Sequence, residues 1–183
     1  MDHYIDITLL PDPEFPATVL MNALFTKLHK ALFELRSTTI GVSFPNCKQT
    51  LGNVLRLHGP VEDLDKLQAL NWVGGMSGYC QQFSIQAVPD GVSYRNVSRK
   101  QPTMSASKLR RLFSRDSISE EDAKNYQAKM VTKEIDAPYL ELVSASNGNR
   151  HRRYIHFSEL QEEPILGSFD KFGLSKTATI PWF

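Results

Sequence analysis

The sequence predicts an α+β fold, in which short strands alternate with helices and a small β-sheet follows. Tyr4 to Leu9 alternates polar with apolar residues, which is the period of a half-buried strand. Apolar residues recur at intervals of three and four between Ala17 and Leu35, which is the period of a helix with one buried face. Asn147-Gly148 lies between two strand-like segments and indicates a β-hairpin.

The first half of the chain contains alternating strands and helices. We expect a strand over 4–9, a helix over 17–35, strands over 39–44 and 54–58, a helix over 61–70 and a strand over 82–88. The order β-α-β-β-α-β is that of a split βαβ, or ferredoxin-like (RRM-like), unit. The turn cluster Pro89-Asp90-Gly91 marks a boundary, so we expect one domain over 1–91 and a second over 92–183.

The second half begins with a basic segment and ends with strands. We expect an arginine-rich helix at about 106–115 and a further helix from Ser119, where Ser-Glu-Glu-Asp has the pattern of a capping box. Strands are expected over 139–146 and 150–157, joined by the Asn-Gly turn, and over 165–170 and 177–182. The second domain therefore combines a helix with a small β-sheet.

Composition fits an ordinary globular protein. Its 183 residues are 41% apolar, which is enough for one domain or two small ones. The N-terminus lacks the basic and apolar regions of a signal peptide, and no apolar run approaches the roughly 18 residues of a membrane span. Cys47 and Cys80 are isolated thiols without disulfide-scaffold or zinc spacing. We therefore expect a cytoplasmic protein.

Positive charge is concentrated in Tyr94 to Arg115, although the whole chain has a net charge of only +1. This segment holds seven of the 21 Lys and Arg residues and no acid. A solvated helix face is the ordinary interpretation, but solvated faces mix both signs, and arginine outnumbers lysine here. Nucleic-acid binding is therefore favoured, without a distinction between RNA and DNA. A second basic cluster follows the hairpin turn at Arg150 to Arg153.

Side chains of the expected arginine-rich helix divide into two faces. Lys108, Arg111 and Arg115 are spaced to share one face. An apolar set shares the neighbouring face and is expected to anchor the helix to the protein body: Leu109, Leu112 and Phe113.

Candidate catalytic groups are one histidine and two serines. His29 lies on the first helix, beside the leucine stripe formed by Leu20, Leu24 and Leu28, where most histidines are surface residues. Ser144 and Ser146 precede the hairpin turn, where hydroxyls commonly satisfy turn backbone groups. No serine-hydrolase triad, metal-binding carboxylate cluster or glycine-rich phosphate loop is evident, so no metal or cofactor is expected. A histidine and a hydroxyl suffice for RNA cleavage, because RNA supplies its own 2′-hydroxyl nucleophile.

Several short segments share their order and spacing with one known family. They are the opening Met-Asp-His-Tyr-Ile-Asp-Ile, the segments at 11–16, 24–29, 41–45, 97–101 and 119–123, and the end Phe-Gly-Leu-Ser-Lys…Pro-Trp-Phe. Over the whole chain the sequence resembles the CRISPR repeat-processing endoribonuclease of subtype I-F. The resemblance implies a ferredoxin-like domain and a second domain that grips an RNA stem-loop. It also implies metal-free cleavage at the 3′ base of the stem, giving a cyclic phosphate and a 5′-hydroxyl.

The same resemblance implies roles for the catalytic candidates. His29 matches the general base toward the 2′-hydroxyl, Ser144 the serine that positions this hydroxyl, and Ser146 a second hydroxyl beside it. Phe172 stands where the family commonly has tyrosine, and its ring can pack near His29 but cannot donate a hydrogen bond.

RNA recognition is likewise implied for the basic residues. Arg99 and Gln101 match a pair that reads guanine and adenine edges low in the stem. His151 matches a phenylalanine that stacks on the terminal base pair. Ser114 replaces a family arginine, which implies fewer groove contacts. The residues expected on the groove-binding helix are Lys108, Arg110, Arg111 and Arg115.

Partners implied by the family are the CRISPR repeat stem-loop, in precursor and mature guide RNA, and the other subunits of a type I-F ribonucleoprotein complex. Two alternatives remain open. One is a non-catalytic subunit that caps the guide RNA hairpin, which the missing hydroxyl at Phe172 favours. The other is a general single-strand RNA-binding module of similar fold.

Overall fold

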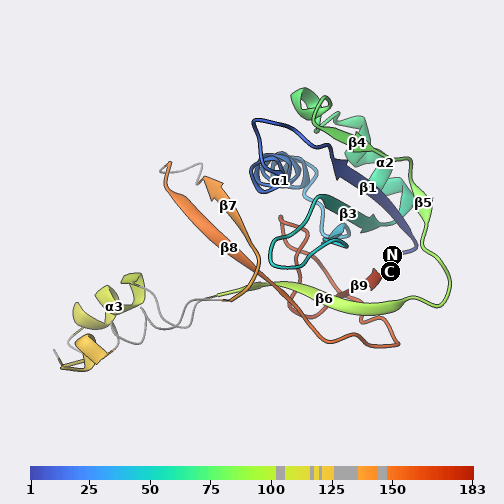
Figure 1. The fold of residues 1–183 in the computed structure, drawn as a ribbon. Coiled ribbons are helices and arrows are strands. Elements are labelled where there is room, and N and C mark those ends of the chain that lie inside the picture. Colours follow the sequence, from blue (N-terminus) through green and yellow to red (C-terminus); the bar gives the residue numbers. More distant parts are fainter. Residues whose placement is uncertain (102–105, 116–117, 120, 126–135, 144–147) are drawn as a thin grey trace.

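Two antiparallel sheets and two longer helices form the body of the computed structural model (Figure 1). The structure describes residues 1–101, 106–115, 118–119, 121–125, 136–143 and 148–183. Together the helices and sheets make the predicted α+β fold. Among the described residues, no helix is long and apolar enough to cross a membrane.

The first sheet and its helices follow the predicted order of elements. They are β1 (His3–Leu9), α1 (Ala17–Glu34), β2 (Gly41–Ser43), β3 (Val54–Gly59), α2 (Val61–Ala69), the short 3₁₀ helix η1 (Gly74–Met76), β4 (Cys80–Gln82) and β5 (Gln86–Ala87). The strands are ordered β2-β3-β1-β4, and β5 also pairs with β1. All pairings are antiparallel.

The single strand predicted over 82–88 is wrong in detail, because the structure contains two short strands there. Ile7 pairs with Gln82, and Tyr4 pairs with Gln86. Three residues of the later segment thus stand opposite two residues of β1, which interrupts the ladder as a bulge does.

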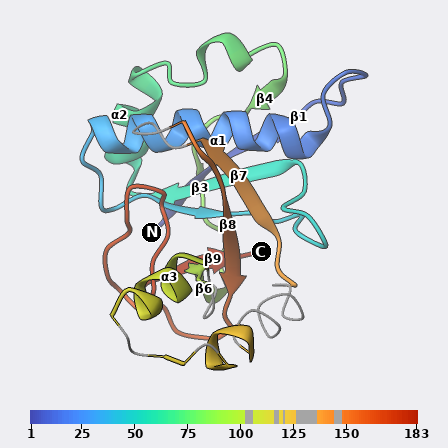
Figure 2. The same cartoon turned by 90° about the vertical axis from the view of Figure 1, so that its left-hand side faces the viewer.

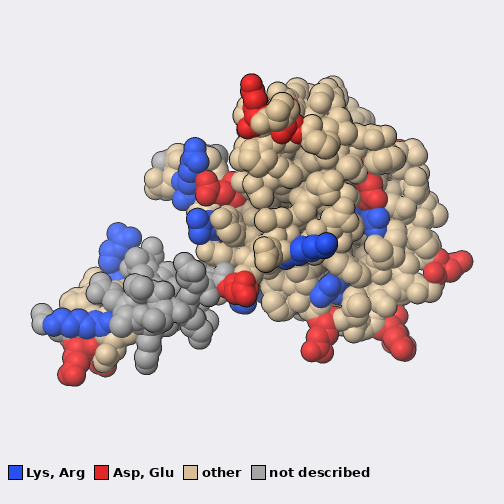
Figure 3. Space-filling view, viewed as in Figure 1, with Lys and Arg blue, Asp and Glu red and all other residues tan. Residues whose placement is uncertain are grey.

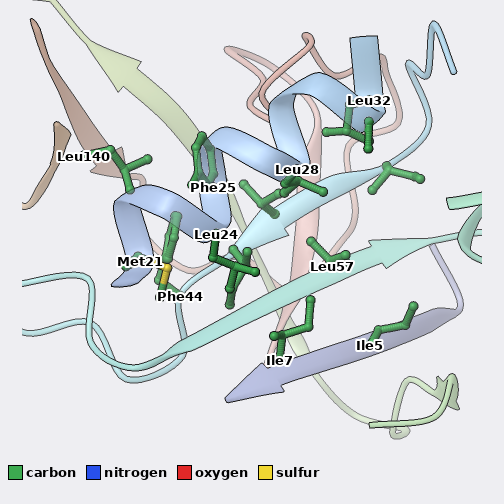
Figure 4. Close-up of a cluster of buried hydrophobic side chains, with 14 of the residues drawn as sticks. Ile5, Ile7, Met21, Leu24, Phe25, Leu28, Leu32, Phe44, Leu57 and Leu140 are labelled. Carbon is green, nitrogen blue, oxygen red and sulfur yellow. The ribbon is translucent and has the colours of Figure 1, made fainter. Parts of the chain in front are cut away.

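The core of the first unit lies between α1 and the sheet. Figure 4 shows Leu24 and Leu28 of α1 above the strand residues Ile7 and Leu57, and all four side chains are fully buried. The leucine stripe read from the sequence is therefore the buried face of α1. Burying such side chains stabilises the fold by about 1.5–3 kcal/mol each.

The second sheet contains β6 (Ser93–Lys100), β7 (Tyr139–Val143), β8 (Arg150–Phe157) and β9 (Thr179–Trp182), in the order β7-β8-β6-β9. The predicted hairpin strands are β7 and β8, and the last predicted strand is β9. Residues 144–147 lie outside the described residues. The strand predicted over 165–170 is absent, and only Ile165 of this segment bonds to β9, through Thr179.

Sequence reasoning missed β6, which forms the first part of the basic segment. Only Val97 of its eight residues is buried, so the strand shows no clear apolar alternation. Its backbone is nevertheless paired on both sides, by β8 and by β9. Pairing with two neighbours, rather than side-chain burial, makes this segment a strand.

Packing between α1 and the second sheet creates the candidate site. Figure 2 shows β7 and β8 crossing over α1, and the Asn22 side chain of α1 accepts a hydrogen bond of 2.9 Å from the backbone N–H of Glu141 in β7. One hydrophobic cluster includes Leu28 of α1, Leu140 of β7 and Ile180 of β9. The core therefore continues across the boundary expected at residue 91.

Helix α3 (Ala106–Phe113) stands apart from both sheets (Figure 1). The expectation that Leu109, Leu112 and Phe113 anchor it to the body is wrong: Leu109 is buried but outside the main core cluster, and Phe113 is 47% exposed. The helix ends at Phe113, so Arg115 lies in the following turn. The predicted cap at Ser119 is present, and its hydroxyl accepts a 3.1 Å hydrogen bond from the Asp122 N–H.

Candidate active site

His29 of α1 is held by one hydrogen bond and one ring contact. Its Nδ1 lies 2.8 Å from the backbone carbonyl oxygen of Lys171. A carbonyl only accepts, so Nδ1 carries a proton, and in the neutral form of the ring Nε2 is the base. The imidazole also stacks on Phe172, with ring centroids 3.8 Å apart and planes inclined by 6°. Together these contacts fix both the tautomer and the orientation of the ring.

The segment that supplies Lys171 and Phe172 is a tight loop organised by Asp170. One carboxylate oxygen of Asp170 accepts hydrogen bonds from the N–H groups of Phe172, at 2.8 Å, and Leu174, at 3.1 Å. The Gly173 N–H donates to the Asp170 carbonyl at 2.8 Å. Asp170 thus shapes the turn that places Phe172 against His29.

Arg153 of β8 contacts the same aromatic ring. Its guanidinium carbon lies 3.6 Å from the Phe172 centroid. Two groups this close to one centroid need opposite faces, so Phe172 is sandwiched between His29 and Arg153. Burial, with a smaller contribution from the nearby charge of Arg99, lowers the pKa of Arg153 to about 10. Arg153 remains a cation at neutral pH.

These groups line a pocket of about 480 Å³ between α1, the β7–β8 hairpin and the Asp170 loop. Its walls are formed by Thr26, His29, Lys30, Phe33, Leu142, Val143, His151, Arg153 and Phe172. The lining is largely apolar, with Thr26, two histidines and two cations at its polar positions. Such a pocket can seat a base or ribose while His29 contacts a hydroxyl.

A second pocket of about 470 Å³ lies next to the first, with Arg153 lining both. Arg99 and Gln101, at the end of β6, line this second pocket together with Lys176. With Arg153, these side chains offer several hydrogen-bond donors and three positive charges, beside the carboxylate of Asp170. Figure 3 shows further cations over α3 and the β7–β8 hairpin, with acidic side chains beside them. The positive charge of the second pocket suits a polyanion.

Comparison with known proteins identifies the family. Residues 4–183 match the family model described as CRISPR-associated protein (Cas_Csy4). The chain belongs to this family. It is 41% identical over 184 residues to the CRISPR-associated endonuclease Cas6/Csy4 of Escherichia coli (strain UTI89 / UPEC), covering 100% of both chains. It is also 41% identical over 187 residues to the protein of that name from Pseudomonas aeruginosa (strain UCBPP-PA14), again covering 100% of both.

Among solved structures, the CRISPR endoribonuclease Cse3 bound to a 19-nucleotide RNA aligns with 98% of this chain and 100% of its own. The identity is 12% and the TM-score 0.37, so the family assignment rests on the sequence relatives. As a member of the Cas_Csy4 family, with relatives named endonucleases, the chain is an endonuclease.

Of the site residues predicted for this Cas_Csy4 family member, His29, His151 and Phe172 lie together in the first pocket. Arg99 and Gln101 lie together in the second. Ser144 and Ser146 lie outside the described residues, but Val143, which precedes them, lines the first pocket. Arg110 and Arg111 are exposed on α3, apart from both pockets, and the side chain of Lys108 lies outside the described part.

Sequence reasoning included Arg153 only in the basic cluster Arg150 to Arg153, without singling it out as a site residue, and it missed Asp170. Strand periodicity could have identified Arg153 as a site residue. Residues two apart on β8 share a face, and His151 was already a candidate. Asp170 precedes Gly173 by three residues, which is a pattern typical of a turn. The turn was not predicted because residues 165–170 were assigned to a strand. Among the described residues, no group of three or more His, Cys, Asp or Glu side chains is placed to hold a metal ion.

Proposed function

We propose that the protein is a metal-independent endoribonuclease that cleaves CRISPR precursor RNA at the 3′ base of the repeat stem-loop. Both relatives are named CRISPR-associated endonuclease. The hydrogen bond from His29 Nδ1 to the Lys171 carbonyl carries this proposal, because it leaves Nε2 free to accept a proton. Imidazole has an ordinary pKa near neutrality and suits this role.

The chemistry is an internal attack of the RNA on its own phosphate. His29 Nε2 removes the proton of the 2′-hydroxyl, and the 2′-oxygen bonds to the adjacent phosphorus. The bond from phosphorus to the 5′-oxygen breaks, and this oxygen takes up a proton. The products are a 2′,3′-cyclic phosphate and a 5′-hydroxyl. Ser144 positions the 2′-hydroxyl, and Ser146 supplies a second hydroxyl beside it.

RNA recognition is assigned to three surfaces. Arg99 and Gln101 read guanine and adenine edges in the lower stem, where each bidentate pair contributes about 1–3 kcal/mol of discrimination. The cations of α3 contact the groove and its phosphates. His151 stacks on the terminal base pair beside the first pocket.

Residues 1–91 form a ferredoxin-like domain in this proposal, supported by the strand order β2-β3-β1-β4 with α1 and α2. Residues 92–183 form the domain that grips the hairpin. The protein stays bound to the mature guide RNA as a subunit of a type I-F complex in the cytoplasm, which agrees with the free thiols of Cys47 and Cys80.

Cleavage of the repeat RNA in EDTA tests the proposal. Wild type is expected to cut the ribose substrate and to leave a cyclic phosphate, whereas a 2′-deoxyribose at the scissile site blocks cutting. His29→Ala is expected to slow cutting by roughly 10²–10⁴-fold while binding stays nearly intact. His156→Ala is the matched control, because that histidine is exposed on β8. Cutting that requires a divalent metal would contradict the mechanism.

A second candidate is a non-catalytic subunit that caps the guide RNA hairpin. Phe172 favours it, because the ring against His29 has no hydroxyl to donate. Tight hairpin binding without any cyclic phosphate product would select this candidate. Equal affinity for the stem-loop and for an unstructured strand would contradict both the endoribonuclease and the hairpin-capping subunit.

A further inference from the structure

Arg153 is a buried cation that forms no ion pair in the described part of the chain. The residue is 7% exposed, and its Nε has no hydrogen-bond partner among the residues that the structure describes. Burying a charge is costly unless a partner compensates it, and an unpaired buried donor adds to that cost. The free protein therefore carries an unfavourable feature that a bound anion would relieve.

The surroundings of Arg153 define the kind of anion. Arg99 is close enough to disfavour its charged form, and Asp170 is the acid that favours it. Arg99, Arg153 and Lys176 all line the second pocket, and Asp170 is the one acid among the described residues of the lining. The three cations outnumber this acid, so the lining has a net positive charge. Such a lining favours a monoanionic phosphodiester as the ligand, because planar guanidinium groups bind phosphate oxygens in pairs.

The position of Arg153 indicates where this phosphate lies in the substrate. Arg153 separates the pocket that contains His29 from the pocket that contains Arg99 and Gln101. An RNA strand whose bases are read in the second pocket and whose ribose reaches His29 in the first must pass this side chain. We propose that Arg153 binds the scissile phosphate of the RNA at the junction of the two pockets. This inference rests on the proposed function, since it requires RNA in both pockets.

Such a contact acts on the reaction itself. Attack by the 2′-oxygen increases the negative charge on the phosphate oxygens, and a fixed guanidinium in a partly dry site stabilises that charge. The Phe172 ring contacts the Arg153 guanidinium on one face and the His29 imidazole on the other. One ring therefore orients both the base and the phosphate-binding group. Arg153 then serves as a catalytic residue beside His29.

The test is a double-mutant cycle between Arg153 and the phosphate. The ligand is repeat RNA made uncleavable by 2′-deoxyribose at the scissile site, with either the ordinary phosphate or a neutral methylphosphonate at that linkage. In wild type, the methylphosphonate is expected to weaken binding by about 10- to 100-fold, the range of a hydrogen bond between charged groups. In Arg153→Met, which keeps the length and apolar stem, the methylphosphonate should change affinity less than twofold.

The matched control is Arg152→Met, which removes the same charge one residue earlier on β8. Arg152 is exposed and stacks on Tyr139 instead, with its guanidinium carbon 4.5 Å from that ring centroid. In Arg152→Met, the methylphosphonate is expected to weaken binding by the same factor as in wild type. An equal penalty in wild type and Arg153→Met would overturn the proposal.

A further arm needs no variant and so does not depend on folding of Arg153→Met. Methylphosphonates placed singly along the RNA should give wild type its largest penalty at the scissile linkage, and a flat profile would overturn the proposal. Because the RNA is uncleavable, these results stand even if the protein does not cut. Normal His29-dependent cutting without coupling at Arg153 would instead remove this inference and leave the proposed function intact.

Discussion

The N–H of Val42 donates a hydrogen bond of 3.0 Å to the carbonyl oxygen of Gly173. This bond ties the loop that carries Phe172 to β2, at the edge of the first sheet. Gly173 has a φ of 68°, and a Cβ atom there would lie 2.6 Å from Val42 Cγ1. Glycine is thus required both by the backbone angle and by the closeness of the strand.

Gly173→Ala should therefore impair both stability and cleavage. The left-handed conformation costs a residue with a Cβ about 1–2 kcal/mol, and the clash with Val42 adds to this and displaces Phe172 from His29. Thermal melting and single-turnover cleavage measure the two effects. Gly91→Ala separates strain from clash, because Gly91 has a φ of 70° but no atom within 4 Å of the added Cβ. Equal melting losses in both variants would contradict the clash.

Removing the ring in Phe172→Ala should reduce the cleavage rate by at least tenfold. The substitution deletes the surface against which both His29 and Arg153 stack, so the base and the cation lose their alignment. Phe172→Tyr should stay within a few-fold of wild type, because the ring stack and the Lys171 carbonyl already orient His29. Single-turnover rates at saturating protein distinguish this effect from weaker binding. A Phe172→Ala rate equal to wild type would show that the stack is dispensable.

Periodicity in the sequence predicted most of the first unit, apart from the interruption between β4 and β5, because the core of this unit follows local patterns. Leu24 and Leu28 are buried by their own helix face, and Ile7 by the alternation of β1, so local patterns and final burial agree. The same reasoning failed at β6, where Val97 alone is buried and pairing with distant strands decides the structure.

The candidate site was predictable only in part. The resemblance placed His29 and Phe172, and the structure brings them into contact. Asp170 could not be assigned by periodicity, since its role lies in backbone hydrogen bonds to Phe172 and Leu174. Arg153 is 124 residues from His29 in sequence, so their shared contact with one ring follows from the packing of β8 over α1 rather than from any local pattern.

The buried histidine of β3 should make stability depend on pH. Complete burial, aided by the charge of Arg56, lowers the pKa of His58 from 6.5 to about 3. Between these values the unfolded chain binds a proton that the folded protein does not, so stability is lost as pH falls. The loss approaches about 1.4 kcal/mol per pH unit below 6.5, or about 2 kcal/mol between pH 7 and pH 5.

Denaturant unfolding of His58→Gln at pH 7 and pH 5 measures this contribution. Glutamine does not titrate, and its amide can retain the contact that His58 Nε2 makes with Ser43 Oγ at 2.8 Å. The variant should lose about 2 kcal/mol less than wild type over this pH interval. His156→Gln, at an exposed position of β8, should follow wild type. Parallel curves for wild type and His58→Gln would exclude His58 as the source.

The exposed cations of α3 should contribute to RNA affinity through phosphate contacts. Each phosphate that a protein cation neutralises releases counterions, which steepens the dependence of log K on log salt by about 0.7–0.9. Arg111→Ala should therefore make this slope shallower by about that amount, and Arg110→Ala provides a second measure on the same helix. Affinities for uncleavable repeat RNA, titrated from about 50 to 200 mM salt, give the slopes.

Lys66→Ala is the control for these slopes, because Lys66 is exposed on α2, far from α3, and forms an ion pair of 2.9 Å with Asp63 (Figure 1). Its slope should equal that of wild type. An unchanged slope in both arginine variants would place α3 outside the RNA interface. Because α3 stands apart from both sheets, Arg110→Ala and Arg111→Ala should leave the thermal stability of the protein unchanged. A shallower slope in Arg111→Ala can then be assigned to a lost phosphate contact rather than to a disturbed fold.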